Sequence, residues 1–303
     1  MNLGQKIIVV VAAFVVTFVS ICTFFKNDIR FFLTSKKVER NYGKTQENRY
    51  FTIDEFDFVN NYEEAEVHSK QEIIDSIYYL INSGVSYSER YCARDYVDCY
   101  KDMEEVSSDT NLLSVLNNYV HPYNSFDNIV FNFDERVIQI EINHAYSDDE
   151  IQQLSSKVDQ LIEENVDRSL PTKEQIRVIH DYIINHTEYD KLKTENINDT
   201  TYKSNTAYGV LFEGYGICSG YSDAMKLFLD KLNIINYKIS NDQHIWNLVN
   251  LDGVWYHLDL TWDDPVSDKN ITRDSYFMIT TKNLKALDDD VHYYNTVLFK
   301  EAV

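Results

Sequence analysis

Two alternating runs joined by a tight turn constrain this chain more than any other stretch. The segment 243–265, QHIWNLVNLDGVWYHLDLTWDDP, alternates apolar and polar residues on both sides of Asp252-Gly253. Asp-Gly between such runs is a strong signal for a two-residue hairpin turn. Residues paired across a hairpin share a face and side chains alternate with a period of two, so His244 and Asp259 become diagonal neighbours on one face. The backbone is therefore predicted to present a histidine and a carboxylate together.

His257 is a second candidate base on the same hairpin. The predicted register pairs Leu251 with Val254 and leaves His257 on the face of Asp259, two residues earlier. A histidine in a strand is more often a partly buried polar residue that fills space than a catalytic group. We therefore interpret His257 as a packing residue and predict His244 as the base.

A cysteine surrounded by glycines precedes the hairpin. In GYGICSGYSDAMKLFLDKL, residues 214–232, Cys218 stands where a run with helical spacing begins. The N–H groups and the positive dipole at a helix N-terminus stabilise an anion, and a thiol placed there has a lowered pKa. Gly216 and Gly220 are expected to leave room for a substrate carbonyl and for backbone N–H bonds to an oxyanion. The cysteine alone leaves open the alternative of a buried, inert thiol.

These residues together fit thiol catalysis. Cys218 would be the nucleophile, His244 would accept its proton and later protonate the leaving amine, and Asp259 would fix the imidazole tautomer. Cysteine, histidine and aspartate are also metal ligands, but the sequence has no C-x-x-C or H-x-x-x-H spacing to support a metal site. We expect neither a metal nor a cofactor. The sequence does not show whether the hairpin packs against the cysteine helix.

The combined motifs resemble the transglutaminase-like superfamily. The match includes G-x-C-x-G-Y around Cys218, H-x-W-N-x-V around His244 and W-Y-H-L-D-x-T-W-D-D-P around Asp259, and it covers residues 170–285. The resemblance implies a papain-like α+β fold with helices packed on an antiparallel sheet. It also implies a Cys218–His244–Asp259 triad that transfers acyl groups of protein or peptide amides through a thioester.

The same resemblance leaves the final reaction open. Members of this superfamily include crosslinking enzymes, deamidases, peptidases and proteins that have lost catalysis. A papain-like cysteine peptidase of the cell envelope is therefore one alternative to a transferase or hydrolase. A non-catalytic protein-binding module that retains the fold is the other.

An apolar run near the N-terminus predicts a membrane anchor. The run from Ile7 to Phe25 is nineteen residues long, which as a helix spans about 28 Å, close to the hydrocarbon thickness of a bilayer. No small-x-small cleavage site follows it, so we predict an uncleaved single-pass anchor over 1–28. The basic residues that follow the apolar run in the sequence favour a cytoplasmic location of the catalytic domain. A candidate Cys92–Cys99 disulfide and the anchored or exported state of many bacterial relatives favour the outside, which we predict.

The remaining chain divides into a polar stalk over 29–60, a small α+β region of unknown role over 61–167 and the catalytic domain over 168–303. Strands are expected at 129–133 and 136–142, where apolar and polar residues alternate. Three helix starts carry the capping-box pattern, namely Ser69 with Glu72, Ser147 with Glu150, and Thr172 with Gln175.

The charge of the chain excludes one class of partner. Among 303 residues, 49 are acidic and 28 are basic, so the net charge is −21. Such a chain repels the phosphate backbone of nucleic acids. The expected partners are a protein or peptide substrate and, through the N-terminal helix, a membrane.

Overall fold

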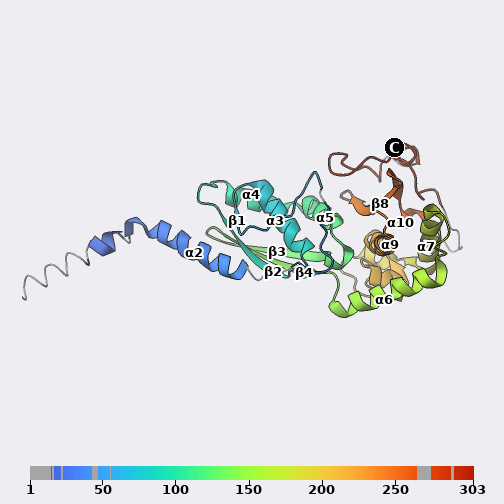
Figure 1. The fold of residues 1–303 in the computed structure, drawn as a ribbon, viewed down its shortest axis with the longest axis horizontal. Helices are drawn as coiled ribbons and strands as arrows, with labels where there is room; N and C mark the ends of the chain where they lie inside the picture. Colours follow the sequence, from blue (N-terminus) through green and yellow to red (C-terminus); the bar gives the residue numbers. More distant parts are fainter. Residues whose placement is uncertain are drawn as a thin grey trace, which may run out of the picture.

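The computed structural model describes residues 15, 17–21, 23–42, 47–54, 56–264, 274–287 and 290–303. Mixed helices and sheets form its body, from which helix α2 (Lys26–Tyr42) extends away (Figure 1). Among the helices of these residues, none is both long enough and apolar enough to cross a membrane. The predicted span over 7–25 lies mostly outside the described residues.

The region 61–167 is built on a four-stranded sheet. Its strand order is β1-β2-β4-β3, in which β1 runs parallel to β2 and the other pairs are antiparallel. The strands are β1 (Glu66–Val67), β2 (Tyr87–Cys92), β3 (Phe126–Asp134) and β4 (Val137–His144). Strand β3 contains the strand predicted at 129–133, and β4 begins one residue later than the strand predicted at 136–142. A disulfide joins Cys92 at the end of β2 to Cys99 at the start of α4.

Helices α3 (Lys70–Asn82), α4 (Cys99–Ser108) and α5 (Thr110–Asn118) pack with this sheet. The chain before them, predicted as a stalk, is packed from residue 47 onward. Val59 is fully buried, and the Asn82 amide exchanges hydrogen bonds with the backbone of Thr52. Apolar side chains in this stretch therefore attach it to α3.

The three predicted helix starts differ in their chemistry. The Ser147–Glu150 pair forms a complete capping box at α6 (Asp148–Asn165). Ser69 caps α3, but Glu72 accepts the N–H of His68 instead of that of the cap residue.

The third capping box, Thr172 with Gln175, was wrong. Pro171 is the N-cap of α7 (Thr172–His186) and makes no side-chain cap. The carbonyl of Pro171 accepts the N–H groups of Glu174 and Gln175, so Thr172 already lies inside the helix.

A second, three-stranded antiparallel sheet carries the predicted hairpin. Its order is β7-β8-β9, with β7 (Asn236–Ser240), β8 (Ile245–Leu251) and β9 (Val254–Leu258). Leu251 pairs with Val254 and Asn247 with Leu258, which confirms the predicted turn and register.

The other short elements complete the C-terminal half. They are the 3-10 turn η1 (Pro122–Asn124), β5 (Glu188–Tyr189), α8 (Lys191–Glu195), the π-helical turn η2 (Gly209–Glu213), β6 (Tyr215–Gly216), α9 (Cys218–Lys231), α10 (Leu260–Asp263) and α11 (Thr281–Leu287). Strands β5 and β6 pair in parallel just before α9, which fixes where that helix begins.

The three-stranded sheet lies between two hydrophobic cores. Val249 and Leu258 pack with α6, α7 and α9 in one core. Ile239, Trp246 and Leu248 pack with α3, α4, α5 and the four-stranded sheet in the other. Because successive strand residues face opposite sides, β8 contributes to both cores. The region 61–167 thus covers the face of the β7-β8-β9 sheet that α9 leaves open.

The glycines around Cys218 have a different role from the predicted one. A Cβ on Gly220 would overlap the carbonyl oxygen of Ser204, and a Cβ on Gly216 would lie 2.8 Å from carbons of Tyr221 and Val210. Neither glycine opens a path for substrate through the position its side chain would take. Both allow the start of α9 to pack against the chain that precedes it.

We predict that Gly220→Ala lowers the free energy of unfolding by about 3 kcal/mol, because a methyl group cannot fit against a backbone oxygen. Urea denaturation of the full chain measures this loss. Gly253→Ala is the control, since its Cβ would meet nothing within 4 Å while its φ of +87° carries conformational strain. That strain costs about 1 kcal/mol. Equal losses in the two variants would contradict the packing role of Gly220.

Candidate active site

Cys218 is the first residue of α9, and it is the one free cysteine in the described part of the chain. Ile217 is the N-cap of α9 and provides no side-chain cap. The N–H groups of the first turn therefore keep their affinity for an anion. The thiol is partly exposed, so the alternative of a fully buried, inert cysteine does not describe it.

The contact that the sequence could not show is the packing of the hairpin on α9. The Ser222 hydroxyl lies 2.8 Å from the carbonyl oxygen of Cys218 and 3.0 Å from that of Ile245. The Asn247 amide donates to the carbonyl of Ser222 at 3.0 Å. One turn of helix α9 is thereby joined to the first residues of strand β8, and this brings His244 beside Cys218.

The backbone of His244 is held by Asn241. The carboxamide oxygen of Asn241 accepts the N–H groups of Gln243 and His244. The imidazole stacks on the indole of Trp246, with 5.6 Å between ring centroids and 14° between planes. Backbone and ring are thus both fixed, and the side chain of His244 is 93% buried.

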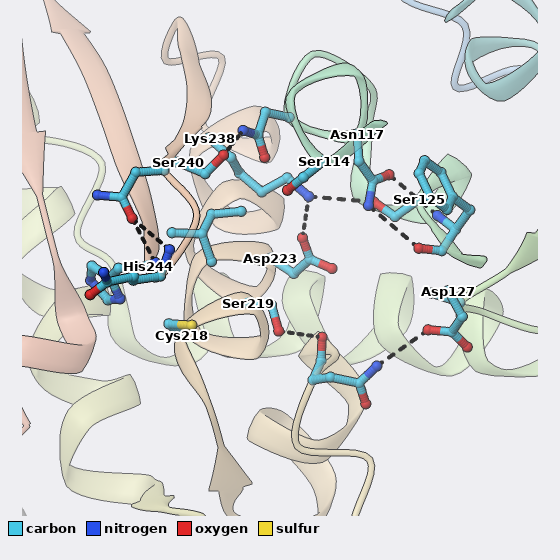
Figure 2. A pocket seen from close by; sticks show the side chains of 17 residues that line it. Ser114, Asn117, Ser125, Asp127, Cys218, Ser219, Asp223, Lys238, Ser240 and His244 are labelled. Carbon is cyan, nitrogen blue, oxygen red and sulfur yellow. Dashed lines mark hydrogen bonds and ion pairs between the residues drawn. The ribbon is translucent and has the colours of Figure 1, made fainter. Parts of the chain in front are cut away.

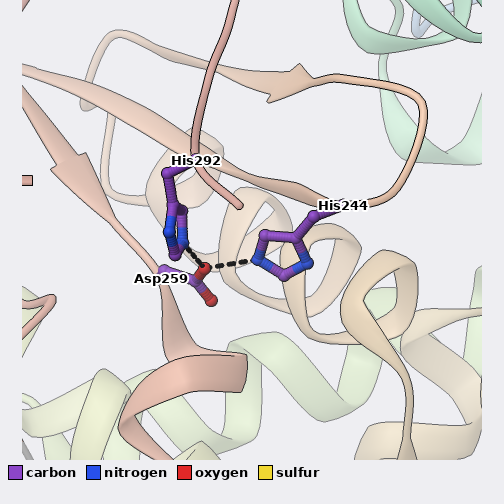
Figure 3. Close-up of side chains that lie close together, drawn as sticks. All are labelled: His244, Asp259 and His292. Atoms are coloured by element: carbon purple, nitrogen blue, oxygen red, sulfur yellow. Dashed lines mark hydrogen bonds and ion pairs between the residues drawn. The ribbon is translucent and has the colours of Figure 1, made fainter. Parts of the chain in front are cut away.

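Asp259 accepts hydrogen bonds from three groups, and Figure 3 shows the two imidazoles among them. Its Oδ2 accepts from Nε2 of His244 at 2.5 Å and from Nε2 of His292 at 2.8 Å. Its Oδ1 accepts the N–H of Trp262 at 3.2 Å, and Asp259 is the N-cap of α10. The hairpin ladder ends one pair earlier, at Asn247 and Leu258, which frees the carboxylate to turn toward the imidazoles.

Electrostatics keep the His244–Asp259 pair charged. Burial lowers the pKa of His244, but the Asp259 carboxylate and the adjacent Cys218 thiol outweigh burial and raise that pKa from 6.5 to about 10. Burial would raise the pKa of Asp259, yet His244 and His292 hold it below its usual range. Since Nε2 of His244 is bound to Asp259, its Nδ1 is the ring nitrogen that can serve Cys218.

His257 lies on the neighbouring strand but serves packing, as interpreted from the sequence. Its Nδ1 accepts the indole N–H of Trp246 at 3.0 Å, and its Nε2 lies 3.0 Å from the hydroxyl of Thr281. Burial and then His292 lower the pKa of His257 to about 3. Both ring nitrogens are engaged and the ring is neutral, so His257 is not available as the base.

His292 is a site residue that sequence reasoning missed. It comes from a segment 33 residues after Asp259, with no motif around it, and only the fold brings it to the carboxylate. The Asn241 amide donates to the carbonyls of Val291 and Tyr293 at 2.7 and 2.8 Å. The same side chain therefore fixes the turn that carries His244 and the segment that carries His292.

The three residues His244, Asp259 and His292 are also of types that bind metal ions. Tetrahedral ligands about 2.0–2.1 Å from a zinc ion lie about 3.3 Å apart. The two imidazole nitrogens lie 2.5 and 2.8 Å from Oδ2 of Asp259, and such distances are typical of hydrogen bonds. The arrangement suits a buried carboxylate with two imidazole donors.

A cavity of about 320 Å³ opens beside the thiol (Figure 2). Cys218 and His244 lie at one end of it, and Ser125 and Asp127 lie at the other. About half of its lining is amide and hydroxyl side chains, which come mainly from the region 61–167 and from residues 240–243. A substrate can therefore reach the sulfur without any rearrangement of the buried His244–Asp259 pair.

Comparison with known proteins gives structural likenesses only. No family model and no curated protein matches this chain. A crystal structure of a TGase is similar at 14% identity and a TM-score of 0.36, over 62% of this chain and 53% of that one. A candidate cysteine protease from Cytophaga hutchinsonii is similar at 15% identity and a TM-score of 0.28, over 44% of this chain and 61% of that one.

The chain thus spans about half of the TGase and about three-fifths of the candidate protease. Their TM-scores are too low to decide an activity, so the function proposed below rests on the contacts around Cys218.

We predict that His292→Gln is more stable than His292→Ala by about 2 kcal/mol near pH 6, because glutamine keeps an N–H donor for the charged, buried Asp259. Urea denaturation between pH 3 and 7 measures the difference. Asp259 has a depressed pKa in the folded chain, so its contribution exists above the unfolded value of about 3.9 and disappears as pH falls through the folded value. The unfolded-state pKa is common to both variants and cancels, so their difference should shrink only as pH falls through the folded-state pKa of Asp259 in His292→Ala, where burial acts without the His292 donor. Equal stability of the two variants at pH 6 would mean that His292 only fills space.

Proposed function

We propose that this chain is a membrane-anchored, transglutaminase-like cysteine enzyme that transfers or hydrolyses acyl groups of protein or peptide amides. Cys218 is the nucleophile, His244 the general base and acid, and Asp259 the group that orients His244. The observation that carries this proposal is the hydrogen bond from Nε2 of His244 to a buried carboxylate, with the thiol of Cys218 against the same imidazole.

The chemistry follows from that arrangement. The Cys218 thiolate attacks the carbonyl carbon of the amide, forming a C–S bond, and the C–N bond of the tetrahedral intermediate then breaks. His244, which holds the thiol proton, passes it to the leaving amine. An incoming amine or water gives a proton to His244 and attacks the thioester carbonyl, forming a C–N or C–O bond. The C–S bond then breaks, the acyl product leaves, and the proton on His244 returns to the sulfur of Cys218.

The start of α9 supplies the stabilisation of charge in this scheme. Negative charge develops on the carbonyl oxygen as the thiolate attacks. The first-turn N–H groups of α9, which have no side-chain cap, are positioned to donate to that oxygen, and such preorganised donors stabilise an oxyanion. Asp259 keeps His244 in the Nε2–H tautomer and stabilises its charged form.

Two alternatives share parts of this proposal. A cysteine peptidase of the cell envelope would use the same thioester and would take only water, never an amine, as the acceptor. A non-catalytic binding module would keep the fold without needing a reactive thiol. The reactivity of Cys218 separates the module from both enzymes, and adding a primary amine to the reaction separates the transferase from the peptidase.

We predict that Cys218 is alkylated by iodoacetamide rapidly at pH 6, where an ordinary thiol with a pKa of about 8.5 is almost fully protonated. The paired imidazolium of His244 stabilises the thiolate, so His244→Ala should slow the reaction at pH 6 by about 100-fold and less at pH 9. Rates followed by intact mass of the full chain between pH 5 and 10 test this prediction.

Cys218→Ala is the control for labelling of other thiols. Asp259→Asn should retain the fold while losing amide turnover by about four powers of ten, because the asparagine favours the wrong tautomer of His244. A thiol that reacts only above pH 8 and does not respond to the loss of His244 would favour the binding module.

We also propose that the catalytic domain lies outside the cell on a single-pass anchor. The apolar run over 7–25 is long enough for the anchor. The Cys92–Cys99 disulfide belongs to an oxidising compartment, since reducing systems keep cytosolic thiols free.

We predict that protease added to intact cells degrades the domain from residue 61 onward, and that alkaline carbonate does not release the full chain from membranes. A variant lacking residues 1–28 should no longer sediment with membranes. A cytoplasmic protein of known location serves as the control for cell integrity. Protection from protease until the cells are lysed, with Cys92 and Cys99 in the reduced form, would contradict the extracellular location.

A further inference from the structure

We propose that the cavity beside Cys218 is a subsite for a neutral carboxamide-type side chain of the substrate, and that the region 61–167 builds its inner wall. The inference deepens the function proposed above and rests on it. It concerns a side chain next to the acyl group that Cys218 attacks, not the reacting amide itself. The geometry that supports it lies on α5, on β7 and around the start of β3.

The wall opposite Cys218 comes from outside the catalytic core. Ser114, Asn117 and Asn118 of α5 line the cavity together with Ser125 and Asp127 around the start of β3. None of these residues belongs to the three motifs around Cys218, His244 and Asp259. The choice of substrate side chain is therefore separated in the chain from the chemistry.

Asn118 on this wall has a buried acceptor that needs a hydrogen-bond donor. The residue is fully buried, and its Nδ2 donates to the Ser240 hydroxyl at 2.6 Å. Its Oδ1 has no hydrogen-bond partner among the described residues. A buried acceptor without a partner is unfavourable, so a donor that enters from the cavity would stabilise the complex.

Ser240 completes a two-point contact. Its oxygen accepts from Asn118, and a hydroxyl that accepts still has its own proton to donate. A primary carboxamide carries both an N–H for Oδ1 of Asn118 and a carbonyl for the hydroxyl of Ser240. An alkyl side chain offers neither, and it would leave both polar groups buried without partners.

The charges in the cavity exclude an acidic side chain. Lys238 is buried and bound to Asp223 at 2.7 Å, and Asp223 also accepts from Tyr146 at 2.6 Å. His244 at the other end is bound to Asp259. The cations that face the cavity are thus already paired, and Asp127 adds a further carboxylate to the lining. A substrate carboxylate would be desolvated there without a cation to receive it.

The inference is tested with chloromethyl ketones of short peptides that differ in one side chain, which is glutamine, glutamate, norleucine or lysine. One series varies the residue that bears the ketone and a second series varies the residue before it. The reagent forms a C–S bond with Cys218 and loses chloride, so the rate reports binding beside the thiol. We expect the glutamine reagent to react about tenfold or more faster than the norleucine and glutamate reagents in one of the series.

Variants of residues on this wall then show which side chains cause the preference for glutamine. Asn118→Leu should bring the glutamine and norleucine rates within about twofold of each other, and Ser240→Ala should remove part of the preference. Asn118→Asp should shift the preference toward the lysine reagent. Ser114→Ala, on the same wall one helical turn earlier, is the matched control and should keep the preference. Should Asn118→Leu fail to fold by circular dichroism, Asn118→Asp and Ser240→Ala decide the assignment.

Methyl methanethiosulfonate, too small to need the subsite, reports the reactivity of the thiol in every variant. Normal reactivity with this reagent and no preference among the side chains would overturn the inference alone. A preference for glutamate would also overturn it, because the cavity would then present a donor and not an acceptor. A thiol inert to every reagent would overturn the proposed function, and this inference with it.

Discussion

A buried carboxylate governs the architecture around the thiol. Asp259 is 2% exposed, and an ionised group at such a depth is tolerated only when charged or hydrogen-bonding partners surround it. Its partners are His244, His292 and the backbone of Trp262, which come from three parts of the chain. Each must be held in place by further contacts, such as those of Asn241 with the turn before β8 and with the segment 291–293. The positions of the side chains in this site therefore follow from the need to surround the charge of Asp259 with hydrogen-bond donors.

The sheet that carries this site is shared between two cores. Val249 faces the helices that include α9, whereas Leu248 and Trp246 face the region 61–167. Neither core is complete without the β7-β8-β9 sheet. The N-terminal region therefore supports one face of the β8-β9 hairpin as well as one wall of the cavity.

The parts of the fold that could be predicted from sequence are those with local causes. Asp252-Gly253 determines a turn that determines the register of a hairpin, and Ser147 with Glu150 determines a helix start. Where contacts between distant parts of the chain determine the structure, local sequence patterns gave a wrong prediction or none. Pro171 displaced a predicted cap, and Gly216 and Gly220 turned out to face packed neighbours. His292 and Asn118 carry no motif, because their roles arise only from the segments that fold beside them.

The shared clamp at Asn241 has a consequence for the order in which this protein becomes reactive. Cys218, His244 and Asp259 are all synthesised before the segment 291–293, yet that segment supplies His292 and the second attachment of Asn241. Until it docks, the carboxylate lacks one of its two imidazole donors. The charge of Asp259 is thus fully compensated only after the chain has been made as far as the segment 291–293.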